Sequence, residues 1–175
     1  QTWFEPGKAF LQYLSRAQVM LQYGEPVSDM LCVGEAQNLQ EDAIDPYDFM
    51  HQNINFLDGK IKLPSGRMYS AIRISNSLKA TPALLEKIKL LQTGNQVIAP
   101  DFIVEKADTI GAVKILHRKG IDGDLYFVTN LHKKQQDIRI SFRQKGLQPE
   151  LWQAEDGSQI DANIWEEKGE RTTVD

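Results

Sequence analysis

Hydrophobic and polar positions follow a helical period near the start of the chain. Over residues 6–23, large apolar side chains recur three and four positions apart, which predicts an amphipathic helix that Gly24 ends. The apolar face of this helix is formed by Phe10, Leu14, Ala17 and Leu21. Two large aromatic residues, Trp3 and Phe4, precede it, and we expect them to pack against a partner.

Three short apolar runs follow, at residues 29–34, 69–75 and 96–99. Runs of this length are typical of buried strands in a parallel sheet. A helix is predicted between the last two runs, because Thr81 can cap it and Pro82 fits its first turn. The residues expected to pack this helix on the sheet are Leu84, Leu85, Ile88 and Leu91.

Beyond Pro100 the hydrophobic period changes to two, which predicts strands at residues 113–118, 124–129 and 137–143. These strands are expected to form an antiparallel sandwich-like domain. We expect the charged tail from Glu166 to fray.

The predicted fold class is therefore α/β: a small flavodoxin-like parallel sheet, of the glutamine-amidotransferase kind, with flanking helices, followed by an antiparallel β-sandwich-like domain. The expected domain organisation is a linking helix over residues 1–25, an open-sheet domain over 26–100 and an antiparallel β domain over 101–175.

Composition narrows the function classes. The 175 residues are 41% hydrophobic and carry a net charge of −4, which is typical of a soluble globular protein and offers no basic surface to nucleic acid. No apolar run reaches the roughly 20 residues that a membrane-spanning helix needs. The single cysteine, Cys32, lies in a predicted buried strand, where we interpret it as a small hydrophobic residue and not as a nucleophile.

An acidic segment follows the first apolar run, at the end of a strand where α/β proteins tend to bind ligands. Its acidic residues do not follow the spacing of a calcium-binding loop, so a calcium site remains an alternative without a motif. Asp45 before Pro46 more simply predicts the cap of a short helix. The acidic residues are Glu35, Glu41, Asp42, Asp45 and Asp48.

Two further groups are candidates for binding. The pair His117 and Arg118 could belong to a site at the domain junction, or could hold two domains together by hydrogen bonds and charge. Trp152 and Trp165 could stack on sugar rings or be buried in a small β core. The sequence motifs of dinucleotide-binding, P-loop, serine-hydrolase and zinc-protease sites are missing from the chain.

Three segments, in this order, resemble the C-terminal part of glycoside hydrolase family 106, the α-L-rhamnosidases and their relatives. The first runs from Thr2-Trp3 through the predicted helix to Gly34-Glu35. The second runs from Tyr47-Asp48 through the Ser65-Gly66 turn to Thr81-Pro82. The third comprises His117-Arg118, the run at 124–130, Phe142-Arg143 and the Pro149-Glu-Leu-Trp152 series. The resemblance covers nearly the whole chain.

This resemblance implies an accessory part of a hydrolase that acts on rhamnose-containing plant or bacterial polysaccharides; the alternative is a non-catalytic carbohydrate-binding or structural module. The family's catalytic carboxylates belong to a barrel upstream of Gln1, so no residue of this chain is assigned a catalytic or metal-binding role, and no cofactor is expected. The implied partners are carbohydrate and that barrel. The residues proposed to bind substrate are Trp3, Glu35, His117 and Arg118.

The resemblance also implies a bacterial exported protein, periplasmic or extracellular. One departure from the family pattern lies at Ala99-Pro100-Asp101, where the family usually has a longer passage between a strand and the Pro-Asp-Phe sequence. Here the two are fused, by natural shortening or by excision of a segment.

Overall fold

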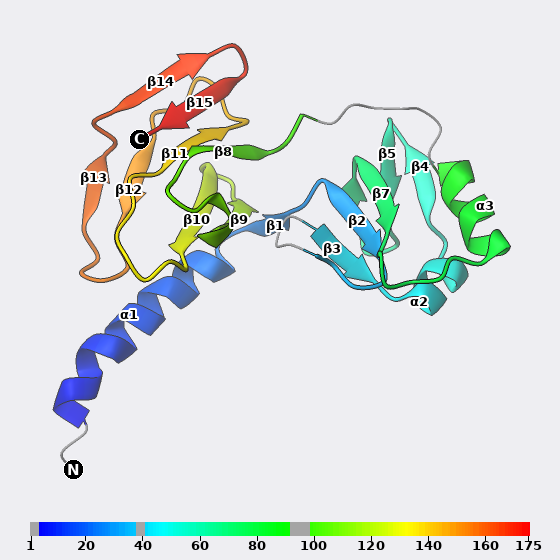
Figure 1. The fold of residues 1–175 in the computed structure, drawn as a ribbon, viewed down its shortest axis with the longest axis horizontal. Coiled ribbons are helices and arrows are strands. Elements are labelled where there is room, and N and C mark those ends of the chain that lie inside the picture. Colours follow the sequence, from blue (N-terminus) through cyan, green and yellow to red (C-terminus); the bar gives the residue numbers. More distant parts are fainter. Residues whose placement is uncertain (1–3, 38–40, 92–98) are drawn as a thin grey trace. The chain divides into compact units, whose positions relative to one another are not determined.

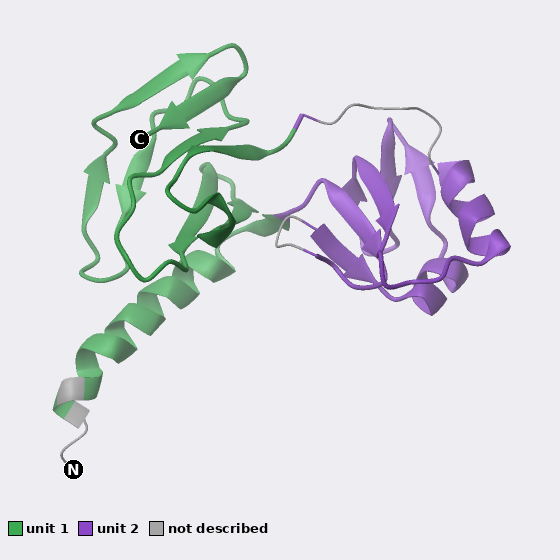
Figure 2. Ribbon diagram, viewed as in Figure 1, with its two compact units in different colours: residues 1–26, 100–175 green, residues 27–99 purple. Residues whose placement is uncertain are grey.

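The computed structural model describes residues 4–37, 41–91 and 99–175. The chain divides into two compact units, which are coloured separately in Figure 2. Unit 1 comprises residues Gln1–Pro26 and Pro100–Asp175, and unit 2 comprises Val27–Ala99. The long first helix, α1 (Phe4–Gln22), therefore belongs with the second half of the chain.

Unit 2 contains a three-stranded parallel sheet in the order β3 (Glu41–Ile44), β2 (Met30–Val33) and β7 (Ala71–Ile74) (Figure 1). The parallel pairing predicted for the first two apolar runs is confirmed, since Val33 pairs with Ile74. The third predicted strand, at 96–99, falls almost wholly outside the described residues.

Unit 2 also contains an antiparallel sheet from the middle of its sequence. Its strands are β4 (Asn55–Leu57), β5 (Lys60–Lys62) and β6 (Met68–Tyr69). The turn from β4 to β5 places Asp58 and Gly59 at φ values of 51° and 77°, the left-handed geometry of a two-residue hairpin turn.

Two helices complete unit 2, and both begin where a cap was predicted. Asp45 caps α2 (Pro46–His51), because its carboxylate accepts a hydrogen bond of 2.8 Å from the Tyr47 amide. Thr81 caps α3 (Pro82–Leu91) by accepting from the Leu84 amide at 3.3 Å. Both helices contribute to one core, which contains Leu31, Val33, Ile44, Phe49, Ile54, Ile61, Tyr69, Ile72, Leu84, Ile88 and Leu91.

Unit 1 is built from antiparallel sheets. The largest has the order β14 (Trp165–Lys168), β15 (Arg171–Val174), β11 (Arg139–Phe142) and β8 (Phe102–Lys106). A second has the order β1 (Glu25–Val27), β9 (Val113–Lys119) and β10 (Asp124–Asn130). A two-stranded ribbon joins β12 (Glu150–Trp152) to β13 (Gln159–Asp161), and a short 3₁₀ turn, Ile110–Ala112, precedes β9.

The predicted flavodoxin-like, glutamine-amidotransferase-like class is wrong. Among the described residues the chain has only three α-helices and is mostly β, in several small and largely antiparallel sheets of β-sandwich-like character. A doubly wound sheet needs a crossover of a dozen or more residues, usually a helix, between parallel strands. Only residues 34–40 separate β2 from β3, and the antiparallel strands β4 to β6 occupy much of the connection to β7.

The fraying predicted for the tail from Glu166 is also wrong. Strand β15 lies between β14 and β11, and its central residues Thr172 and Thr173 are buried. The last strand thus completes a sheet. No described helix has the length and apolarity needed to cross a membrane.

Candidate functional site

A buried cluster of polar side chains surrounds His117 in unit 1. His117 Nδ1 lies 2.8 Å from Asp101 Oδ2, and its Nε2 lies 2.7 Å from Asp124 Oδ1. The histidine is 7% exposed, and both carboxylates are nearly buried. Each ring nitrogen therefore has a carboxylate oxygen as its hydrogen-bond partner.

The strand register explains why the sequence builds this cluster. Along β9 the inward positions are Val113, Ile115 and His117, which alternate with more exposed residues. Tyr126 of β10 pairs directly with His117, and their rings stack at a centroid distance of 4.1 Å. The Tyr126 hydroxyl donates to Asp101 Oδ1 at 3.2 Å.

Hydrogen bonds among its own members hold this cluster together. Burial, with the nearby Asp101 and Asp124 carboxylates, raises the pKa of Tyr126. Within the described ranges every buried side-chain nitrogen and oxygen has a hydrogen-bond partner. The geometry therefore assigns His117 to linking β9, β10 and the segment that enters β8.

Arg118, the next residue along β9, anchors the end of α1. Its Nε donates to the Tyr23 carbonyl at 2.5 Å, and its Nη2 donates to the Gly24 carbonyl at 2.8 Å. A guanidinium at the C-terminal end of a helix satisfies carbonyls that the helix leaves unpaired. Of the two alternatives weighed for the His117-Arg118 pair, this geometry favours hydrogen-bonded linkage of structural elements.

Of the four predicted substrate-binding residues, His117 and Arg118 are described within the same unit. Glu35 is an exposed residue of unit 2, whereas His117 and Arg118 belong to unit 1. Trp3 lies outside the described residues. Cys32 is fully buried, its thiol bonds the Glu35 carbonyl at 3.2 Å, and burial raises the pKa of that thiol, which confirms its interpretation as a core residue.

Two of the acidic residues after β2, Glu41 and Asp42, are engaged in ion pairs of unit 2. Arg73 on β7 contacts both carboxylate oxygens of Glu41, at 2.7 and 2.5 Å. Asp42 accepts from Arg67 at 2.6 Å and from the Tyr69 hydroxyl at 2.7 Å. In the described part of the chain no three His, Cys, Asp or Glu side chains are grouped as metal ligands.

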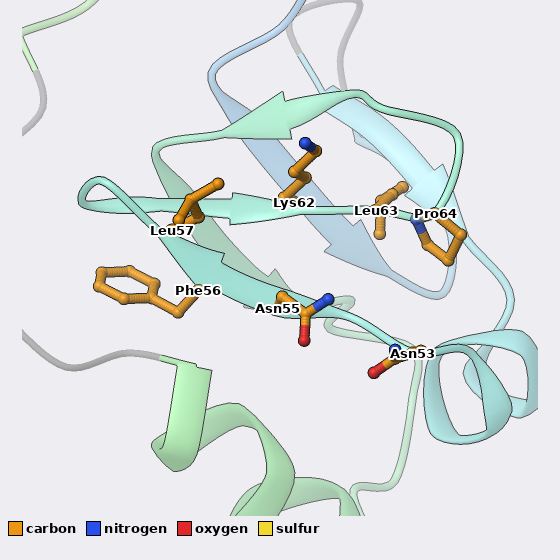
Figure 3. A pocket seen from close by; sticks show the side chains of 7 residues that line it. All are labelled: Asn53, Asn55, Phe56, Leu57, Lys62, Leu63 and Pro64. Carbon is orange, nitrogen blue, oxygen red and sulfur yellow. The ribbon is translucent and has the colours of Figure 1, made fainter.

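Unit 2 also has a shallow pocket of about 400 Å³ beside the β4–β5 hairpin (Figure 3). Phe56 and Leu57 remain 40% and 47% exposed there. Two apolar side chains directly before the Asp58-Gly59 turn were a signal in the sequence that could have located this surface. The pocket is lined by Asn53, Asn55, Phe56, Leu57, Lys62, Leu63 and Pro64.

An exposed tryptophan lies on the β12–β13 ribbon of unit 1. Trp152 is 49% exposed, and its indole N–H donates to Glu150 Oε2 at 2.9 Å. Gln159 pairs with Trp152 and Asp161 pairs with Glu150, so these four side chains share one face of the ribbon. An aromatic ring beside carboxylate and amide groups can stack on a sugar ring and accept its hydroxyl hydrogen bonds.

Comparison with known proteins places the chain in a family of rhamnosidase-type glycoside hydrolases. A family model described as alpha-L-rhamnosidase, that of glycoside hydrolase family 106, matches residues 1–101 and 93–165. The chain belongs to this family, which confirms the resemblance. The two matched segments overlap at the junction where the sequence departs from the family pattern.

Two similar proteins extend this comparison. A putative beta-glucuronidase of Formosa agariphila is 27% identical in a comparison over 233 residues. The match covers 98% of this chain and 20% of that protein. The solved structure of a rhamnosidase from Novosphingobium sp. PP1Y has a TM-score of 0.80 at 21% identity, and shares the fold over 98% of this chain and 23% of its own. The chain thus spans about a fifth of the curated relative and under a quarter of the solved rhamnosidase.

Proposed function

We propose that this chain is an accessory, non-catalytic part of a rhamnosidase-type glycoside hydrolase. The observation that carries the proposal is the match of nearly the whole chain to only 20% of the curated relative and 23% of the solved rhamnosidase. In this proposal the catalytic carboxylates lie on another portion of the same polypeptide, the upstream barrel.

The carboxylates that are buried or paired with arginine support the accessory role. Glycoside hydrolysis ordinarily needs two carboxyl groups about 5 to 9.5 Å apart around the scissile bond, open to a sugar. Asp101 and Asp124 instead enclose His117 in the interior of unit 1. Glu41 and Asp42 are engaged by arginines. The substrates in this proposal are rhamnose-containing plant or bacterial polysaccharides, met in the periplasm or outside the cell.

The proposal is tested by hydrolysis of an aryl α-L-rhamnoside. We expect no turnover by residues 1–175 alone, turnover by a longer polypeptide that contains the barrel, and a loss of thermal stability when residues 1–175 are removed from it. Turnover by the isolated chain at an ordinary enzyme rate would refute the accessory role.

A second function, carbohydrate binding, is favoured by the shared face of Trp152, Glu150, Gln159 and Asp161 on the β12–β13 ribbon. The two carboxylates accept hydroxyl hydrogen bonds and repel a uronate, so the expected ligand is a neutral sugar.

Titration calorimetry with rhamnose-containing oligosaccharides tests this second function. We expect weak binding that Trp152→Ala removes. Leu151→Ala is the matched control, because Leu151 points to the opposite face of the same strand. Absence of heat at millimolar sugar would eliminate carbohydrate binding by this ribbon.

A further inference from the structure

The apolar stripe of α1 continues beyond the point where the helix is covered. Phe10, Leu14, Ala17 and Leu21 fall on one face, at successive helical spacings. Ala17 is buried at 7% exposure, whereas Leu14 is 37% and Phe10 is 61% exposed. The same face is therefore packed on unit 1 over its second half and open over its first.

Hydrogen bonds hold the covered half of α1 in place. Arg16 donates to the carbonyls of Ala154 and Glu155, at 3.0 and 2.8 Å, in the turn that joins β12 to β13. Near the C-terminal end the helix contacts β10 (Figure 1), and Arg118 bonds the carbonyls that follow it. Because the helix is anchored in this way, its open stripe is presented in a fixed direction from unit 1.

Large apolar side chains are grouped on the open part of this helix face. Leu11 lies beside it and is 54% exposed, so three large apolar side chains adjoin one another on this face. Covering them would remove apolar surface from water, which favours contact with a partner. Val19, which is 72% exposed, lies about 180° around the helix from Phe10 and is an isolated exposed residue of the ordinary kind.

We propose that the stripe formed by Phe10, Leu11 and Leu14 docks on the catalytic portion of the same polypeptide. The inference rests on the proposed function. The larger part of each similar protein lies outside the region that this chain matches. The same polypeptide can therefore supply the surface that covers the stripe. Three side chains bury far less than the 1,200 Å² or so of a stable dimer interface, whereas a covalently linked partner needs little area because its effective concentration is high.

Hydroxyl-radical footprinting tests the docking directly. Residues 1–175 are labelled alone and within a longer polypeptide that includes the catalytic barrel. We expect labelling of Phe10, Leu11 and Leu14 to fall at least fivefold in the longer polypeptide, and labelling of Val19 to stay within twofold. Equal labelling of the stripe in both forms would overturn the proposal. Protection that appears in the isolated chain at high concentration would also overturn it, because the occupant would then be a second copy.

Substitutions supply an independent readout. Phe10→Lys with Leu14→Lys should restore labelling of Leu11 in the longer polypeptide, while Val19→Lys, the matched control, should not. Both variants should keep the melting temperature of the isolated chain within about 2 °C, since the replaced side chains are exposed there. If Leu11 stays protected in the double variant, the stripe does not make the contact.

Failure of docking and failure of the accessory role give different results. Protection of the stripe from hydroxyl-radical labelling decides whether the stripe docks, whatever the hydrolysis rate. If protection is found but residues 1–175 can be removed with no change in rate or stability, docking is upheld and the accessory role fails. If removal impairs the enzyme but the stripe is labelled equally in both forms, the accessory role is upheld and docking fails.

Discussion

His117 and Asp101 are joined by a hydrogen bond of 2.8 Å between Nδ1 and Oδ2, although one lies within β9 and the other precedes β8. On the other side of the ring, Asp124 accepts from Nε2. The ring and the two buried carboxylates stabilise one another as a set, because removing one member takes a buried hydrogen-bond partner from the others.

The first prediction concerns this set. His117→Phe keeps a ring to stack on Tyr126 but removes both ring nitrogens, so Asp101 and Asp124 each lose a buried hydrogen-bond partner. We expect a loss of about 3 kcal/mol in the free energy of unfolding of unit 1, measured by urea denaturation. His51→Phe is the control, since His51 is exposed and stacks on Tyr47 in unit 2, and should cost under about 1 kcal/mol. Equal costs would contradict the buried network.

The second prediction separates structure from binding at Arg118. Arg118→Gln removes a charged donor from the carbonyls of Tyr23 and Gly24, so we expect unit 1 to lose about 1 to 3 kcal/mol. Lys145→Ala, which breaks an exposed ion pair with Glu170, should leave the unfolding free energy of unit 1 almost unchanged. Calorimetry should show oligosaccharide binding unchanged in both variants. A selective loss of binding in Arg118→Gln would restore this residue to a substrate site.

Local signals in this sequence predicted local structure well. The helix at α1 and the caps at Asp45 and Thr81 all appear where residue chemistry placed them. In each case the determining contacts lie within a few residues, so sequence spacing is enough to find them.

Long-range pairing was harder to predict. The apolar sequence of β2 fits a strand of a doubly wound sheet as well as a strand of the observed three-stranded sheet. Only the neighbouring strands distinguish the two sheets. Strand β15 reads as a charged tail, because the burial of Thr172 and Thr173 depends on β11 and β14. The cluster at His117 likewise depends on Asp101, which no motif connects to it.

The third prediction concerns the turn after α1. Gly24 has a φ of +50°, and a Cβ added there would lie 2.1 Å from the Lys119 carbonyl oxygen. Gly24→Ala should therefore destabilise unit 1 by more than about 2 kcal/mol in thermal or urea unfolding. Gly7→Ala is the matched control, since it lies within α1 with open space around it, and should stabilise the helix by up to about 1 kcal/mol. The same sign for both changes would contradict the close approach of β9 to this turn.

The fourth prediction concerns alkaline pH. Burial raises the pKa of Tyr69 to about 12, and the hydrogen bond from its hydroxyl to Asp42 adds to the shift. Because an unfolded tyrosine titrates near pH 10, the folded state binds the proton more tightly. The resulting stability is fully present below about pH 10 and is lost as the pH rises to about 12. Unit 2 should lose roughly 2 kcal/mol over this window.

Tyr69→Phe tests the assignment, because the ring stays in the core while the titrating group is removed. We expect a modest cost at neutral pH, since Asp42 still accepts from Arg67. From pH 10 to 12 the unfolding free energy of unit 2 should then fall less steeply than in the unsubstituted chain. Phenolate absorbance should show one fewer late-titrating tyrosine, with Tyr126 still resisting ionisation in unit 1 because burial raises its pKa as well. An unchanged slope would mean that Tyr69 does not control alkaline unfolding.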